Sequence, residues 1–262
     1  MRILFVADLV GRPGRQVAQA LLPKLRRDRA VDLVVANGEN LAGGYGVTPS
    51  LVLELFNWGA DVITSGNHIW DRRDGVALLE TEPRLLRPAN YPPGNPGSGT
   101  YVVAVGDTKV AVLNLQGRAF MADIDDPFRV GRTLVDELRS DANIIVIDFH
   151  AEATAEKLAF ANYIDGLVSA VIGTHTHVAT ADERILPGGT AYITDIGMTG
   201  SHAGVIGFEA DLAIQRAMLG RRVRLELADG DLRLQGAIVD VDIGSGKAKS
   251  IERIELVHDE EN

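Results

Sequence analysis

The chain has 262 residues, and 46% of them are hydrophobic, which is enough to build the core of one large α/β domain or two small ones. Its formal net charge of -10 disfavours sequence-independent binding to duplex nucleic acid, because the phosphate backbone is also anionic. No apolar run reaches the length of about 18 residues that a membrane helix needs, and cysteine is absent, which fits a cytoplasmic protein.

Short apolar runs alternate with amphipathic stretches along the first three quarters of the chain, which is typical of an α/β fold. In chain order, the first expected elements are a strand at Ile3–Ala7, a helix at Gly14–Arg27, a strand at Leu33–Ala36, a helix at Pro49–Trp58, a strand at Val62–Thr64 and a short helix at 72–80. A Pro- and Gly-rich loop at 83–99 follows. After it we expect a hairpin of Tyr101–Val105 and Val110–Leu115, a helix at Phe128–Arg139, and strands at Ile144–Ile147, Val168–Ile172 and Ala191–Thr194.

The last part of the chain has a different pattern. Arg222–Leu227, Leu232–Val241 and Ser250–Val257 are separated by turn sequences and predict antiparallel strands at the edge of a sheet. No internal repeat and no linker interrupts the sequence. We therefore expect a single α/β domain over residues 1–262, with one mixed sheet or two.

Polar residues of metal-binding types follow five of the predicted strands. They are Asp8, the pair Glu39 and Asn40, the pair Asn67 and His68, His150, and the pair His175 and His177. Sites in open α/β sheets lie beyond the carboxyl ends of the strands, so these side chains converge if the strands are parallel neighbours.

The residue types suit a site with two metal ions. Carboxylates supply charge, asparagine supplies a neutral oxygen and histidine supplies nitrogen, and a carboxylate such as Glu39 can bridge two ions. Two divalent ions also give the site the local positive charge that an acidic protein needs in order to act on a phosphate. Each residue alone has a simpler explanation: Asp8 and Asn67 are suited to helix caps, and His68 to packing.

The same residues carry a resemblance to a known family. Asp8-Leu9-Val10, Gly38-Glu39-Asn40, Gly66-Asn67-His68, His150 and the GTHTH segment at 173–177 resemble the motifs of the calcineurin-like metallophosphoesterases. Val10 replaces the usual histidine of the first motif, and Glu39-Asn40 replace the usual Gly-Asp. These departures, with DFHAEATAEK at 148–157, are similar to the YmdB-like branch of that superfamily.

The resemblance implies a fold and a ligand set. The fold is a four-layer α-β-β-α sandwich with mixed sheets. One metal would be held by Asp8, Glu39, Asn40 and His177, and the other by Glu39, Asn67, His150 and His175. Iron or manganese is the implied metal, while the donor types leave zinc open. His68 would not bind metal but would protonate the leaving group, a task suited to an imidazole near neutral pH.

The implied activity is metal-dependent hydrolysis of phosphodiesters, with 2′,3′-cyclic nucleotides such as 2′,3′-cAMP as substrates and a hydroxide that bridges the metals as the attacking group. Two alternatives stay open: a phosphomonoesterase or protein phosphatase on the same scaffold, and a nucleotide-binding regulator with weak turnover. We expect a small-molecule substrate, no duplex nucleic acid partner and no membrane partner, and leave a homo-oligomer open.

Overall fold

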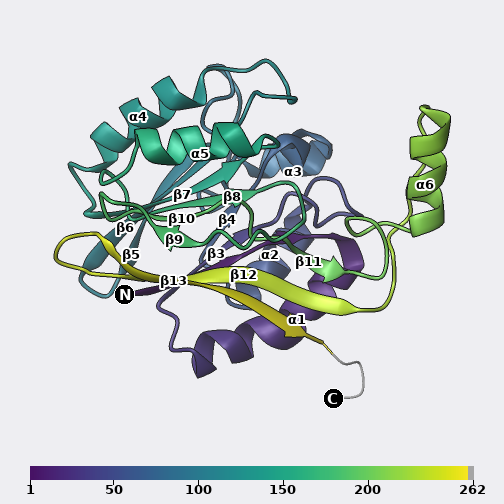
Figure 1. The fold of residues 1–262 in the computed structure, drawn as a ribbon, viewed down its shortest axis with the longest axis horizontal. Helices are drawn as coiled ribbons and strands as arrows, with labels where there is room; N and C mark the ends of the chain where they lie inside the picture. Colours follow the sequence, from purple (N-terminus) through teal and green to yellow (C-terminus); the bar gives the residue numbers. More distant parts are fainter. Residues whose placement is uncertain (259–262) are drawn as a thin grey trace.

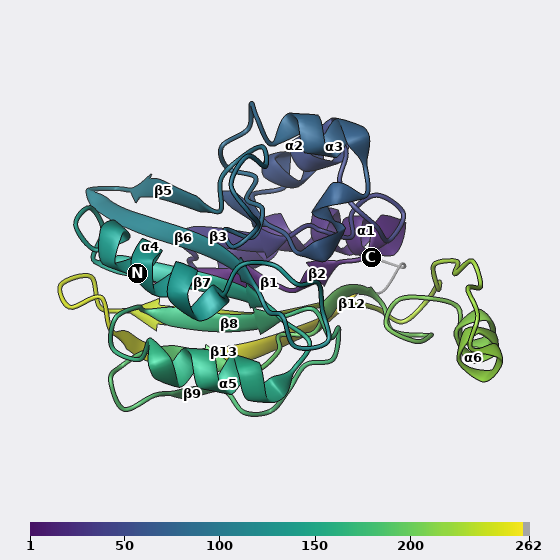
Figure 2. The same cartoon turned by 90° about the horizontal axis from the view of Figure 1, so that it is seen from above.

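Two mixed β-sheets lie face to face in the computed structural model, which describes residues 1–258 (Figures 1 and 2). The first sheet has the order β2 (Asp8–Leu9), β11 (Met198–Ser201), β12 (Leu232–Val241), β1 (Arg2–Val6), β3 (Leu33–Asn37) and β4 (Val62–Thr64), and β13 (Ala248–Val257) also pairs with β12. The second has the order β5 (Thr100–Val105), β6 (Thr108–Gln116), β7 (Ile144–His150), β8 (Ala170–Thr174), β10 (Ala191–Ile193) and β9 (Arg184–Ile185).

Helices cover the outer face of each sheet. The first sheet packs against α1 (Gly11–Asp28) and α2 (Pro49–Asn57), with the one-turn η1 (Asn67–Trp70) and α3 (Arg73–Leu78) nearby. The second packs against α4 (Pro127–Leu138) and α5 (Thr154–Tyr163). The predicted four-layer α-β-β-α sandwich is therefore confirmed.

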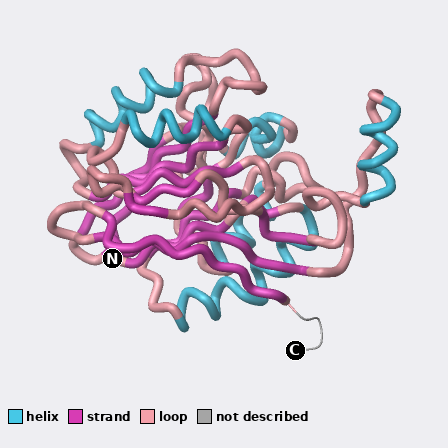
Figure 3. The backbone as a smooth tube through the Cα atoms, in the orientation of Figure 1, coloured by secondary structure: helices cyan, strands magenta, loops and turns pink. Residues whose placement is uncertain are grey.

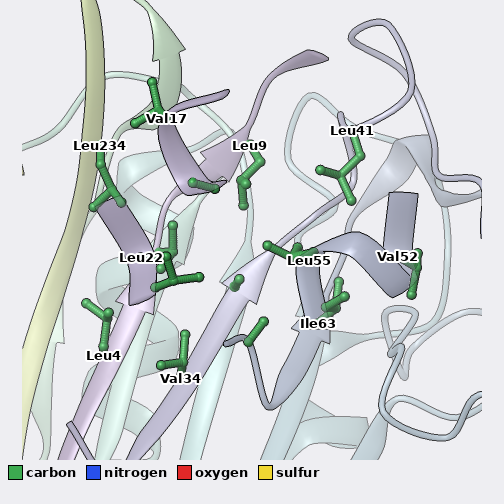
Figure 4. Packing of buried hydrophobic residues seen from close by; sticks show 14 of the residues in the cluster. Leu4, Leu9, Val17, Leu22, Val34, Leu41, Val52, Leu55, Ile63 and Leu234 are labelled. Carbon is green, nitrogen blue, oxygen red and sulfur yellow. The ribbon is translucent and has the colours of Figure 1, made fainter. Parts of the chain in front are cut away.

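Alternation along the strands builds the layers. In β1, Ile3 and Phe5 face the second sheet, whereas Leu4 faces the helices, because successive side chains of a strand point to opposite faces. Figure 4 shows Leu22 of α1 close to Leu4 and to Val34 of β3 in the helix-facing core. Both faces of the central strands are buried, which explains why they appear in the sequence as continuous apolar runs.

Parallel pairing brings the ends of several strands to one side. In the first sheet β1, β3 and β4 are parallel neighbours, and in the second β6, β7, β8 and β10 are parallel. Their carboxyl ends are the positions from which the predicted site residues come. The site is thus assembled from two sheets rather than from neighbours within one.

Several parts of the chain differ from the sequence-based expectation, including the short strands β2, β9 and β11, which were not expected. The helices α5 and α6 (Ala210–Leu219) were not expected, and Arg222–Leu227 forms only an isolated bridge between Leu227 and Phe208 instead of a strand. Figure 3 shows α6 projecting from the body at the end of long loops. Within residues 1–258, no helix has both the length and the apolar character needed to cross a membrane.

Candidate metal centre

The seven predicted metal ligands lie where five strands end. Asp8 follows β1, Glu39 and Asn40 follow β3, Asn67 follows β4, His150 ends β7, and His175 and His177 follow β8. Four of the seven, Asp8, Glu39, Asn40 and His150, are almost completely buried. Together they form two groups of converging donor atoms.

The first group is centred on His150. Its Nε2 atom lies 3.1 Å from Glu39 Oε1, 3.0 Å from His175 Nδ1 and 3.2 Å from Asn67 Oδ1. Glu39, His150 and His175 each offer one donor atom, and these three atoms all lie within 4.8 Å of one another. This is the geometry of donors that surround one small cation.

Neighbouring side chains decide which imidazole nitrogen carries a proton. Thr174 donates its hydroxyl proton to Asp148 at 2.6 Å, so it accepts from His150 Nδ1 at 2.9 Å. His175 Nε2 lies 3.1 Å from the acceptor Glu152 Oε2, which leaves the lone pair on Nδ1. His150 Nε2 and His175 Nδ1 thus face each other beside a carboxylate, and a proton or a metal ion between them satisfies both nitrogens.

The surroundings of His150 and His175 favour one positive charge in this group. Burial lowers the pKa of His150, but the neighbouring Glu39 carboxylate outweighs that effect and raises it to about 9. Burial and the charge on His150 lower the pKa of His175 to about 3. The cluster therefore holds one positive charge at this point, which a metal ion can provide in place of the proton.

The second group contains Asp8, Asn40 and His177. Asp8 Oδ2 lies 3.3 Å from His177 Nε2, while Nδ1 of that histidine donates to the Ile206 carbonyl at 3.1 Å. Asn40 donates its amide to the Gly44 carbonyl at 2.9 Å, which leaves its oxygen free. Asp8 Oδ1 and Asn40 Oδ1 are buried without a hydrogen-bond partner among residues 1–258. Such an atom costs about 1–3 kcal/mol, so the pair fits a second cation.

Gly66 allows the first group of donor atoms to approach the turn after β4. An added Cβ at Gly66 would lie 2.1 Å from His150 Cδ2 and 2.4 Å from Glu39 Oε2. No side chain fits in that space. The backbone of this turn can therefore lie directly against the donor atoms, and it brings Asn67 next to them.

The loop that carries His175 and His177 is strained and tightly held. Both residues have positive φ, 102° and 62°, a conformation that non-glycine residues rarely adopt. The buried Lys157 of α5 donates to the Thr174 carbonyl and to Asp195 Oδ2, each at 2.8 Å. Asp195 in turn accepts from the Thr176 backbone at 3.0 Å. The ion pair thus fixes the loop on both sides of His175.

His68 stands at the edge of the centre rather than within it. Its Nδ1 lies 2.8 Å from Oδ2 of Asp71, the residue that follows η1, and its ring packs edge-on against Tyr45 with ring centroids 4.9 Å apart. His68 lines a cavity of about 400 Å³ together with Glu39, Asn40 and the two histidines of the GTHTH loop. The imidazole is therefore available to a molecule bound in front of the donor atoms.

Sequence reasoning missed three residues that position the site: Asp71, Lys157 and Asp195. Asp71 could have been found from its spacing of three after His68 within a helical turn. Lys157 lies in the DFHAEATAEK segment, but its partner Asp195 is 38 residues away, and no local pattern connects the two.

Comparison with known proteins gives consistent matches over nearly the whole chain. The family described as YmdB-like protein matches residues 4–254. A 2′,3′-cyclic-nucleotide 2′-phosphodiesterase of Bacillus subtilis (strain 168) is 47% identical, over 99% of this chain and 98% of its own. A hypothetical protein from Thermus thermophilus has a TM-score of 0.93 at 41% identity, over 99% of this chain and 100% of its own. A phosphatase from Mycoplasma pneumoniae has a TM-score of 0.93 at 34% identity, over 100% of this chain and 95% of its own.

Proposed function

The chain belongs to the YmdB-like family of the metallophosphoesterase superfamily, and on that premise we propose that it is a metal-dependent phosphodiesterase that hydrolyses 2′,3′-cyclic nucleotides. The observation that carries the proposal is the cluster of Glu39, His150 and His175 donor atoms beside a cavity of about 400 Å³, which Glu39, Asn40, His175 and His177 line. A cavity of this size suits a nucleotide-sized molecule. The Bacillus subtilis relative, a 2′,3′-cyclic-nucleotide 2′-phosphodiesterase, supplies the substrate class.

We propose two metal positions in these groups. Glu39, Asn67, His150 and His175 would hold one ion, and Asp8, Glu39, Asn40 and His177 the other. Iron or manganese suits the mixture of oxygen and nitrogen donors. When bound, the ions supply positive charge that activates a water molecule and stabilises charge on the phosphoryl oxygens.

His68 has the position of a proton donor. Hydrolysis adds one water: its oxygen bonds to phosphorus, the bond from phosphorus to the ribose 2′ oxygen breaks, and that oxygen takes up a proton. Asp71 holds Nδ1 of His68, so the other ring nitrogen, Nε2, is the one that can deliver the proton. Tyr45 packs against the ring and limits its rotation.

Replacement of the shared carboxylate tests the proposal. Glu39→Gln keeps the size of the side chain but removes its charge, so we expect kcat/KM for 2′,3′-cAMP to fall by more than about 100-fold, beyond the usual loss for residues that only orient a ligand. Rates are measured on manganese-loaded and iron-loaded protein, with metal content determined on the same samples.

The exposed Glu80→Gln is the matched control and should retain full activity. Full turnover in Glu39→Gln would overturn the dinuclear centre. Faster hydrolysis of p-nitrophenyl phosphate than of bis-p-nitrophenyl phosphate would instead favour a phosphomonoesterase, and tight nucleotide binding without turnover would favour a regulator.

A further inference from the structure

The segment 205–225, here called the arm, stands apart from the sandwich (Figures 1 and 2). It contains α6, in which no residue is buried, and it exposes Ile214 and Met218. An isolated helix of ten residues is only marginally stable in water. A segment of this kind needs a role other than completion of the core.

The base of the arm forms a wall of the catalytic cavity. Ile206, Phe208, Arg216 and Leu225 line that cavity together with the proposed ligands Glu39, Asn40, His175 and His177. The same four residues line a second cavity of about 630 Å³, which extends along the arm to Arg222. We call this second cavity the arm groove. It adjoins the catalytic cavity along these shared side chains.

The arm groove combines apolar surface with unpaired positive charge. Arg216, Arg221 and Arg222 line it, and none of them forms an ion pair within the part of the chain that the structure describes, whereas Arg2 and Arg233 pair with carboxylates. These cations lie on a protein of net charge -10. Their chemistry suits an anion, and the guanidinium group matches phosphate in particular.

An aromatic surface lies where the two cavities meet. Phe208 lines both cavities, and its ring stacks on Tyr45 with centroids 5.6 Å apart and an interplanar angle of 22°. Phe208 is buried and Tyr45 is half-buried, so Tyr45 is the ring on which a nucleobase of any type could stack. A base at this position would have donor atoms on one side and the arginines on the other.

We propose that the substrate is the 3′ end of a single-stranded RNA that carries a 2′,3′-cyclic phosphate, with the preceding nucleotide bound in the arm groove. The inference rests on the proposed function. At an RNA end, the terminal nucleotide carries a second phosphodiester on its 5′ oxygen, and Arg216 at the junction of the two cavities is placed to bind it. A free cyclic mononucleotide lacks this group and leaves the arm groove empty.

The test compares 2′,3′-cAMP with the trinucleotide ApApA that ends in a 2′,3′-cyclic phosphate, on metal-loaded full-length protein. We expect kcat/KM to be about tenfold higher for the trinucleotide, through stacking and phosphate contacts. We also expect it to fall more steeply with salt, by about 0.7 in logarithmic slope for each extra phosphate bound.

The double variant Arg221→Gln/Arg222→Gln should lower kcat/KM for the trinucleotide about tenfold more than for 2′,3′-cAMP. Arg224→Gln is the matched control, because Arg224 is exposed on the same arm but lines neither cavity. It should leave the ratio of the two substrates at the wild-type value.

Three outcomes would overturn the inference. The first is an equal kcat/KM of the wild-type protein for the two substrates, and the second is a loss of trinucleotide hydrolysis in Arg224→Gln as large as in the double variant. The third is a double variant that keeps wild-type kcat/KM for both substrates but changes its molar mass in light scattering, which would assign the arm to contact with a second copy. Failure of wild-type protein to hydrolyse either substrate would instead reject the proposed function, so the two failures are distinguishable.

Discussion

Thr174 contributes no donor atom to the centre, yet it determines the tautomer of His150. Its single hydroxyl proton goes to Asp148, so its oxygen must accept from His150 Nδ1, and Nε2 is left to face Glu39, where it can carry a proton or bind a metal ion. Asp148 can play this part at neutral pH, although burial raises its pKa to about 6. Hydrogen bonds from Asn37 and Thr64 hold its other oxygen in place.

This chain of contacts predicts the effect of Thr174→Val. The valine has the same shape but no hydroxyl, so His150 loses its orientation and we expect metal affinity to fall about 10–100-fold. Competition with a chromogenic chelator measures the change. Thr174→Ser keeps the hydroxyl and should bind metal like the wild type; equal affinities of the valine and serine variants would contradict the role of the hydroxyl.

At the scale of elements, an ion pair joins α5 to the loops after β8 and β10. Lys157 and Asp195 are both buried, with side-chain exposures of 1% and 0%, and lie 2.8 Å apart. They contact the backbone on either side of His175, whose conformation is strained. Loss of one partner leaves the other as an unpaired charge in the core.

We therefore expect Lys157→Met to lower the free energy of unfolding by about 3–5 kcal/mol, measured by urea denaturation. Lys109→Met, which breaks the exposed pair with Asp141, should cost less than about 1 kcal/mol. In Lys157→Met/Asp195→Asn the loss should be smaller than in Lys157→Met, because no buried charge is left unpaired. A larger loss in the double variant would show that the pair is not coupled.

The elements that the sequence predicted are those with a strong local signal. Strands such as Leu33–Asn37 are buried on both faces and form continuous apolar runs. In contrast, α6 buries no residue, and its apolar residues Ile214 and Met218 face solvent instead of a core. The turn sequence after Arg222–Leu227 suggested a strand. However, β12 already pairs with β11, β1 and β13, so the segment has no free strand edge there and returns along the arm instead.

The candidate site was predictable in part for the same reason. Its proposed ligands are polar residues directly after apolar runs, a local pattern that survives without knowledge of the fold. Lys157 and Asp195, which hold the loop of His175 in place, are 38 residues apart in the sequence. They come together only in the folded protein, where β10 pairs with β8 in parallel. The division of the donors between two sheets also could not be read from the sequence.

At the scale of the whole molecule, the centre lies between the ends of the two sheets. Glu39 and Asn67 extend from the first sheet, and His150 and His175 extend from the second. Ions bound there would tie the sheets together as well as take part in hydrolysis. Metal content should therefore affect global stability.

We expect EDTA to lower the melting temperature of metal-loaded protein, and manganese to restore it. Free metal at about 100 times its dissociation constant stabilises the folded state by about 2.7 kcal/mol. Differential scanning calorimetry measures the shift. Glu39→Gln should show a smaller shift than the wild type, and equal shifts in both proteins would place the stabilising metal elsewhere.

Val10 connects the first motif to the arm. It is buried, and an added Cβ at Gly207 in the arm would lie only 2.8 Å from its Cγ1 atom. A side chain at position 207 would therefore collide with Val10, and the positive φ of Gly207, 94°, also favours glycine there. The residue that departs from the general superfamily motif is thus packed against the arm, so the first motif and the path of the arm constrain each other.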